Sequence, residues 1–266
     1  MLKAFSNLQK LIQKEKIDPS EKVKIGRLIH VLGHISRPFF WEPIAKLFQK
    51  YLSMYYSHLQ WRQWHKNPPH WGDHRIDLFT WPERLNSHWV ERGIYSKELM
   101  RPDSKVLDIG CGDGFYAKYF YASAASTIDC LDIDQTAIKH AKKYNSHPKI
   151  RYFNLDAIKQ SFPSSDYDVV CLDGSLAHFS SEELKILLEK IKKCLATNGV
   201  LVGYEEMEKE AIKSWDHKMV FSKKNDFEEL FSPFFKYIKC IYLESPGRLN
   251  MYFRCSDDKS RIERFQ

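Results

Sequence analysis

The sequence lacks an apolar run of the length that a membrane-spanning helix needs, and we expect no secretory signal in its opening residues. About 20 consecutive apolar residues are required to cross a bilayer, and polar residues interrupt every stretch earlier. The opening segment MLKAFSNLQKLIQKEK places apolar residues at helical spacing and contains no arginine, which favours an ordinary amphipathic helix over a targeting peptide. We therefore expect a protein without a transmembrane segment.

Closely spaced cysteines are also missing. The chain has six cysteines, and no two of them are near enough in sequence to form a CxxC metal motif. Each lies in or beside an expected core strand or helix, where cysteine packs as a small apolar residue. We expect free thiols and a cytoplasmic protein.

Net positive charge is lacking after residue 100 and lies entirely before it. Residues 1–100 carry 16 Lys plus Arg against 9 Asp plus Glu, a net +7, whereas residues 101–266 carry 25 of each and net zero. Six of the seven Trp and seven of the eleven His also lie in the first hundred. This asymmetry predicts two regions with different roles. The basic region is either a solvated face or a surface that attracts an anionic substrate or partner.

The first hundred residues are expected to be helical. Asp18 and Glu21 resemble a capping box, and so do Thr80 and Glu83, which open a segment that Gly93 is expected to end. Between them, WEPIAKLFQKYLSMYYSHLQWRQW keeps apolar residues on one face until the NPP sequence. We expect a helical N-terminal extension over 1–100 that forms a cap.

From residue 105 the pattern alternates between strands and helices. Short apolar strands are separated by helices, such as FYAKYFYA and a longer one from Ser180 that Gly199 is expected to close. Continuous apolar strands between helices predict a mostly parallel α/β sheet covered on both faces. FKYIKCIYLE, SPG and RLNMYFRC predict a closing antiparallel hairpin. We assign this domain to 101–256, followed by a polar tail over 257–266 that we expect to fray.

A glycine-rich loop follows the first of these strands. In VLDIGCGDGF, Asp108 precedes glycines at 110, 112 and 114. Glycine allows positive φ and close approach of the backbone to a ligand, and nucleotides bind at the carboxyl ends of parallel strands. A dinucleotide fingerprint would need glycine at 115, which is Phe115, and the lysine of a P-loop is missing.

The pattern D-x-G-x-G-x-G resembles the first motif of the class I S-adenosylmethionine-dependent methyltransferases, a Rossmann-like family. Three further positions fit that family in order: CLDID with Asp132, 22 residues after Gly110; NLDAI with Asp156; and YDVVCLDG with Asp173. The resemblance implies that Asp132 binds the ribose hydroxyls, that Asp156 and the next amide face adenine, and that the fourth strand lies under the methionine part. The residues it assigns to the cofactor are Asp108, Gly110, Cys111, Gly112, Gly114, Asp132, Ile133, Asp156, Ala157 and Asp173.

Methyl transfer to a hydroxyl requires a base that takes its proton. The candidate catalytic residue is His178 in LDGSLAHFS, for which packing is the competing interpretation. A metal-dependent alternative would pair Asp173 with Glu205 or Glu206. Because Ser175 replaces an acid often found there, we expect no metal.

The segment before the first strand is placed to roof the methyl-transfer site. In relatives, this extension and the insert after the fifth strand, here about 207–224, select the substrate. The candidate residues for substrate contact are Arg75, Trp81, His88, Trp89 and Glu205. A zinc site at His70, Asp73, His74 and Asp77 is disfavoured because Pro68, Pro69 and Gly72 oppose a helix there.

The resemblance therefore implies a methyltransferase that converts S-adenosylmethionine to S-adenosylhomocysteine. We favour a hydroxyl, or an amine, of a small molecule or glycan as acceptor, since CLDGSLA departs from the (N/D)PPY motif of amino-group and nucleobase methylases. DHRIDLFTWPERLNSHWVERG also resembles bacterial methyltransferases that accompany polysaccharide biosynthesis. Alternatives are an RNA or protein methyltransferase that docks through the basic extension and a non-catalytic cofactor-binding partner subunit. The sequence does not set the oligomeric state.

Overall fold

The computed structural model describes residues 31, 42–64, 88–207, 217–245 and 248–263. The expected helices before residue 31, the aromatic stretch 65–87 and most of the insert at 208–216 lie outside the described residues. The chain divides into two compact units, residues 1–58 and 59–266. The second unit holds the expected α/β domain.

Helix α3 (Glu42–Trp64) confirms the helix expected in the N-terminal part. Pro43 occupies its first turn, where a missing N–H costs no helical hydrogen bond. The helix ends shortly before the Asn67–Pro68–Pro69 sequence, which cannot continue it. Within the described residues, no helix is both long and apolar enough to cross a membrane.

The second unit is built on a seven-stranded sheet in the order β3-β2-β1-β4-β5-β7-β6. The first five strands pair in parallel, whereas β7 pairs antiparallel with both β5 and β6, so the expected mostly parallel sheet with a closing hairpin is confirmed. The strands are β1 (Lys105–Ile109), β2 (Thr127–Asp132), β3 (Ile150–Asn154), β4 (Tyr167–Asp173), β5 (Leu195–Met207), β6 (Tyr237–Ser245) and β7 (Arg248–Ser256).

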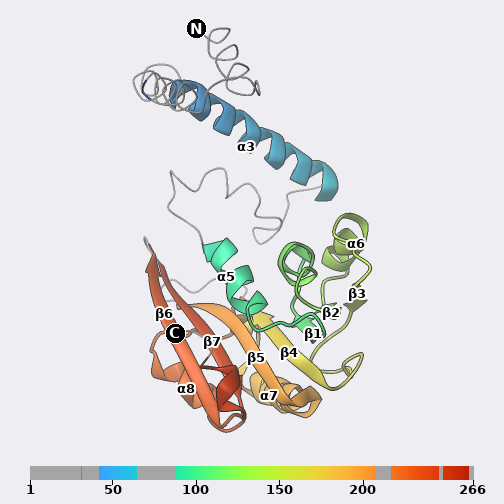
Figure 1. Ribbon diagram of the computed structural model, residues 1–266, viewed down its shortest axis with the longest axis vertical. Helices are drawn as coiled ribbons and strands as arrows, with labels where there is room; N and C mark the ends of the chain where they lie inside the picture. The colour runs from blue at the N-terminus through green and yellow to red at the C-terminus, as the bar shows by residue number, and fades with distance from the viewer. Residues whose placement is uncertain (1–30, 32–41, 65–87, 208–216, 246–247, 264–266) are drawn as a thin grey trace, which may run out of the picture. The chain divides into compact units, whose positions relative to one another are not determined.

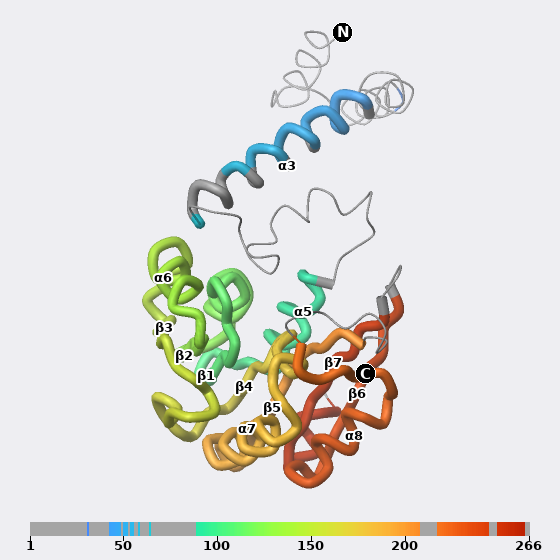
Figure 2. Tube along the Cα trace, turned by 180° about the vertical axis from the view of Figure 1, so that it is seen from behind, coloured from blue at the N-terminus to red at the C-terminus, as the bar shows by residue number. Residues whose placement is uncertain are grey.

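Helices cover both faces of the sheet, as Figures 1 and 2 show. Alternate side chains of a strand point to opposite faces, so Val106 and Val169 enter one core while Leu107 and Val170 enter the other. The first core lies under α5 (His88–Lys97), the π-helix η2 (Ala117–Tyr121) and α6 (Gln135–Tyr144). The second lies under α7 (Ser181–Cys194) and α8 (Asn225–Phe231). Two buried faces explain why the central strands β1 and β4 are mostly apolar.

Three local expectations were wrong. Helix α5 continues through Gly93 to Lys97, because this glycine allows close approach of Phe120, whose ring would lie 2.6 Å from an added Cβ. Helix α7 ends at Cys194, and the residues up to Gly199 join β5 instead. The tail does not fray over 257–263, because the buried Arg261 donates to the carbonyls of Leu99 and Asp168.

Candidate functional site

The carboxyl ends of β1, β2 and β4 meet at one edge of the sheet. The chain runs outward from β1 through β2 to β3 and then returns to place β4 on the other side of β1. The connections therefore leave in opposite directions between β1 and β4. Ligands of α/β proteins bind at the carboxyl ends of strands at such a switch point. The segments that follow β1, β2, β3 and β4 contain most of the predicted site residues.

The loop after β1 depends on its three glycines. Gly110, Gly112 and Gly114 have φ values of 74°, 54° and 74°, a region that other residues adopt at a cost. At Gly114 an added Cβ would also lie 2.7 Å from Tyr152 Cζ, closer than real contacts allow. The Tyr152 hydroxyl donates to the Asn145 carbonyl at 2.8 Å. Tyr152 therefore packs directly against the backbone of Gly114, with no space for a side chain between them.

Asp132, at the end of β2, lies directly against this loop. Its carboxylate accepts the Gly112 N–H at 2.8 Å and the Asp134 N–H at 2.8 Å. Burial raises its pKa, while those two amides oppose the shift. Because a carboxylate offers about four lone-pair sites, Asp132 can still accept the paired hydroxyls of a ribose.

The next residue, Ile133, is 71% exposed, which is unusual for a large apolar side chain at the end of a core strand. A flat base that packed on Ile133 would remove this surface from water, at about 25 cal/mol per Å². The glycine loop, Asp132 and Ile133 therefore fit the nucleoside part of the cofactor that the sequence motifs imply.

Asp108 lies beneath the loop as a buried acid. Burial raises its pKa to about 8, and the neighbouring carboxylates of Asp173 and Asp132 add to the shift. At neutral pH Asp108 is therefore largely protonated and able to donate a hydrogen bond. Cys111, in the same loop, is partly buried, and burial raises its pKa as well.

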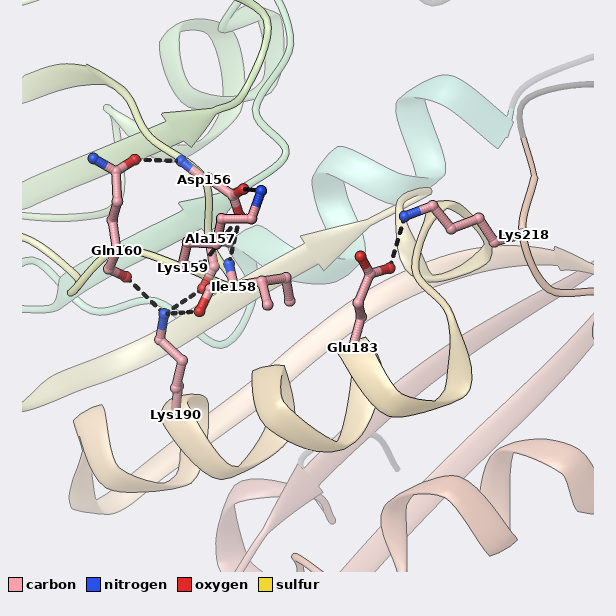
Figure 3. A network of polar contacts seen from close by, with 8 residues as sticks. All are labelled: Asp156, Ala157, Ile158, Lys159, Gln160, Glu183, Lys190 and Lys218. Atoms are coloured by element: carbon pink, nitrogen blue, oxygen red, sulfur yellow. Dashed lines mark hydrogen bonds and ion pairs between the residues drawn. The ribbon is translucent and has the colours of Figure 1, made fainter.

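Asp156, after β3, stabilises its own loop (Figure 3). Its Oδ1 accepts the N–H groups of Ile158 and Lys159 at 2.9 and 3.2 Å, and Lys159 Nζ lies 3.4 Å from Oδ2. Burial acts to raise the Asp156 pKa, but these contacts outweigh it, so the pKa is lowered. The ionised carboxylate lies next to Ala157, which is buried.

Asp173, at the end of β4, forms a buried ion pair with Arg92 of α5. Arg92 Nε lies 3.0 Å from both carboxylate oxygens, Nη2 lies 2.9 Å from Oδ2, and the two side chains are 8% and 5% exposed. Gly174 makes room for the pair, because an added Cβ would lie 2.6 Å from Arg92 Nη2. Burial opposes the charge of Arg92, but Asp173 outweighs it, so the arginine pKa is raised.

Aromatic rings complete the surroundings of this pair. The Arg92 guanidinium lies 4.3 Å from the ring centre of Tyr204, 4.6 Å from that of Trp89 and 5.4 Å from that of Tyr116. Cation–π attraction stabilises a desolvated arginine in such a cage. The predicted residue Trp89 packs on Arg92, and Arg92 itself was not identified from the sequence.

Glu205, at the end of β5, is buried and holds the turn that carries His178. Its Oε2 accepts the Ala177 N–H at 3.2 Å and its Oε1 accepts the Glu206 N–H at 3.1 Å. Burial raises the Glu205 pKa to about 7, against the lowering effects of these amides and of His217 and Arg92. Glu205 thus lies within the electrostatic reach of both basic groups.

His178 belongs to the 3-10 turn η3 (Leu176–His178) and packs edge-to-face on His217, with ring centres 4.9 Å apart. His217 comes from the chain that returns after β5. Lys218 N–H and Met219 N–H both donate to the Ala177 carbonyl, at 2.7 and 3.0 Å. Lys218 also pairs with Glu183 of α7 at 2.7 Å (Figure 3). These contacts hold His178 and His217 next to each other. His217 was not among the site residues predicted from the sequence.

Of the remaining predicted residues, Arg75 and Trp81 lie outside the described residues, as do His70, Asp73, His74 and Asp77. His88 is the first residue of α5, and only its backbone position is described. Among residues the structure describes, no group of three or more His, Cys, Asp or Glu is arranged to hold a metal ion. Asp173, the carboxylate of the disfavoured metal-dependent alternative, pairs with Arg92.

Comparison with known proteins gives a family match over the part of the chain that contains the glycine loop. Residues 106–199 match a family model described as a methyltransferase domain. A human protein named eEF1A lysine and N-terminal methyltransferase is 28% identical over 109 residues, which are 40% of this chain and 16% of that protein. A phosphoethanolamine N-methyltransferase from Plasmodium falciparum is 29% identical over 126 residues, 46% of each chain.

The solved structure of a DhpI–SAH complex has a similar fold. Its TM-score is 0.52 at 16% sequence identity, over 77% of this chain and 96% of that one. The sequence matches are shorter: the chain spans less than a fifth of the human relative's length and under half of the Plasmodium enzyme's. The similarity thus lies in the domain that carries the glycine loop.

Proposed function

From the premise that this chain carries a class I S-adenosylmethionine-dependent methyltransferase domain, we propose that it transfers a methyl group to a hydroxyl of a small molecule or glycan precursor. S-adenosylmethionine supplies an electrophilic methyl group on a sulfonium. The protein's contribution is to bind it, align the acceptor and receive the acceptor's proton. The six cysteines are unbridged, which supports a reducing compartment such as the cytoplasm.

The single observation that carries the proposal is the contact between the glycine loop and Asp132. Three glycines with positive φ and a carboxylate 2.8 Å from the Gly112 nitrogen form one side of a nucleoside site at the edge of a parallel sheet. The glycines of the loop allow a ligand to approach the backbone closely, Asp132 offers acceptors for hydroxyls, and Ile133 offers an exposed apolar surface. This set matches a ribose with a flat base more closely than it matches a phosphate.

The acceptor is expected on the other side of β1, over the ends of β4 and β5. There Arg92 neutralises Asp173, so this carboxylate does not act as a base. His178 is the candidate proton acceptor: as the acceptor oxygen bonds to the methyl carbon, its O–H proton passes to the imidazole. The carbon–sulfur electron pair remains on sulfur. Glu205 and the chain at 217–219 hold the His178 turn in place.

A second candidate acceptor is an amine. Two of the similar proteins are named as methyltransferases of nitrogen, on protein residues and on phosphoethanolamine. The Asp132 carboxylate, at the end of β2, also favours a cationic group over an anionic one at this edge. A protonated amine would have to lose a proton before its lone pair attacks the methyl carbon, and His178 is the candidate to accept that proton. RNA or protein docking on the basic N-terminal region remains the alternative that the assay must exclude.

The test is a transfer assay with S-adenosylmethionine carrying a ¹³C-labelled methyl group. The full chain would be incubated with separated small-molecule, glycan, RNA and protein fractions of a cell extract, and label would be located by mass spectrometry. We expect a product 15 Da heavier than its acceptor, counting the ¹³CH₃ group in place of a proton, in the small-molecule or glycan fraction. Label confined to RNA or protein would contradict the acceptor proposal, and the bond formed, C–O or C–N, separates the two candidates.

A further inference from the structure

The loop after β3 is held from outside by a helix that follows β4. Within the loop, Asp156 N–H donates to Gln160 Oε1 at 2.8 Å and the Asp156 carboxylate accepts two amides. These contacts close the turn but leave the carbonyls of Ala157, Ile158 and Gln160 directed to one side (Figure 3). Parallel carbonyl dipoles repel one another unless a donor lies between them.

Lys190 of α7 supplies that donor. Its Nζ donates to the carbonyls of Ala157, of Ile158 at 3.1 Å and of Gln160 at 2.6 Å. A lysine ammonium has three protons, so each carbonyl can receive one of them. The ammonium also lies 4.8 Å from the centre of the Phe162 ring. One side chain therefore orients three peptide groups of this loop.

The helix that carries Lys190 is rigidly anchored. Leu187, Leu188 and Ile191, which surround it in sequence, are fully buried in the core under α7. The N-terminus of α7 is closed by a capping box between Ser180 and Glu183. The backbone of Lys190 is thus fixed by the core, and the ammonium binds the loop from this anchored helix. Figure 3 shows the side chain rising from α7 toward the loop.

We propose that Lys190 is a positioning residue for the base of the cofactor, acting through the peptide groups of residues 157–160. This inference rests on the proposed function, because it assumes that a nucleoside binds beside Asp132. The loop leaves β3 next to that acid, and Leu155 N–H donates to the Asp132 carbonyl at 3.0 Å. By fixing the loop, Lys190 keeps Asp156 and the amide of Ala157 ready to meet the base.

The variant Lys190→Met keeps the length and the apolar stem of the side chain but removes its three donors. Calorimetry would measure the affinity for S-adenosylhomocysteine, for adenosine, and for S-inosylhomocysteine, in which a carbonyl replaces the adenine amino group. We expect Lys190→Met to weaken S-adenosylhomocysteine and adenosine by the same factor, about tenfold. We also expect its preference for adenine over hypoxanthine to shrink. Lys190→Arg keeps hydrogen-bond donors and should recover most of the affinity and most of the preference for adenine.

The matched control is Lys193→Met, on the exposed side of the same helix. It should bind all three ligands as the wild type does. If Lys190 has only a structural role, Lys190→Met will lower the thermal unfolding temperature and leave the ligand affinities and the base preference unchanged. That result would overturn the inference about Lys190 and leave the proposed function standing. If the wild type binds neither S-adenosylhomocysteine nor adenosine, the proposed function and the inference both fall.

Discussion

Removing the Arg92 guanidinium should destabilise the domain strongly. In Arg92→Met the Asp173 carboxylate would stay buried beside Gly174 without its three nitrogen–oxygen contacts of 2.9–3.0 Å. Breaking a buried pair by removing one partner typically costs about 3–5 kcal/mol. Both side chains are less than a tenth exposed, so solvent screening does not reduce this value.

The assay is urea-induced unfolding of the full chain, followed by circular dichroism. We expect Arg92→Met to lower the free energy of unfolding by about 3 kcal/mol or more. Arg92→Met combined with Asp173→Leu should recover much of the loss, because apolar replacement of a buried pair is often neutral. As a control, Lys259→Met removes one partner of the exposed Lys259–Glu263 pair and should leave the transition unchanged.

Two results would refute this reasoning. One is a free energy of unfolding for Arg92→Met within about 1 kcal/mol of that of the wild type, because the ion pair would then stabilise the fold no more than a surface pair does. If the double variant were no more stable than Arg92→Met, the loss would come from the aromatic cage around the guanidinium and not from an uncompensated carboxylate.

Three further predictions concern the site. Gly114→Ala should abolish binding of S-adenosylhomocysteine in calorimetry, because φ is 74° and the added Cβ meets Tyr152; unchanged affinity would contradict this. Glu205 has a pKa raised from 4.5 to about 7, so it favours the folded state below pH 4.5 and this contribution is lost as the pH rises toward 7. Between pH 4.5 and 7 the free energy of unfolding of the wild type should fall by about 1.4 kcal/mol per pH unit because of Glu205, and Glu205→Gln should remove this fall. A profile of unfolding free energy against pH that runs parallel to that of the wild type would refute the assignment. His178→Ala should lower label transfer about 10²-fold or more with unchanged cofactor affinity, whereas normal transfer would remove His178 from the mechanism.

Features that depend on local sequence were predictable. The glycine loop was recognisable because positive φ requires glycine at fixed positions. Asp132 was identified because the end of the second strand resembles the second motif of the methyltransferase family. The hairpin of β6 and β7 was visible in two apolar runs around a Ser-Pro-Gly turn. Each of these signals lies within a few residues of the feature that it specifies.

Features that depend on pairing across the fold were not predictable. Arg92 and Asp173 are 81 residues apart, and an arginine before a glycine reads as a surface residue near a helix end. Lys190 likewise reads as an exposed residue of an amphipathic helix, although it donates to carbonyls 30 and 32 residues away. The partners of such charged groups are set by the order of the strands, which a single sequence leaves open.

The most direct test of the central claim is calorimetric titration of the full chain with S-adenosylhomocysteine, beside the variant Asp132→Asn. The wild type should bind one equivalent, and Asp132→Asn should bind at least about tenfold more weakly, since an amide offers fewer acceptors for the ribose hydroxyls. Absence of binding by the wild type, or equal affinity in the variant, would contradict the claim that the glycine loop and Asp132 form a cofactor site.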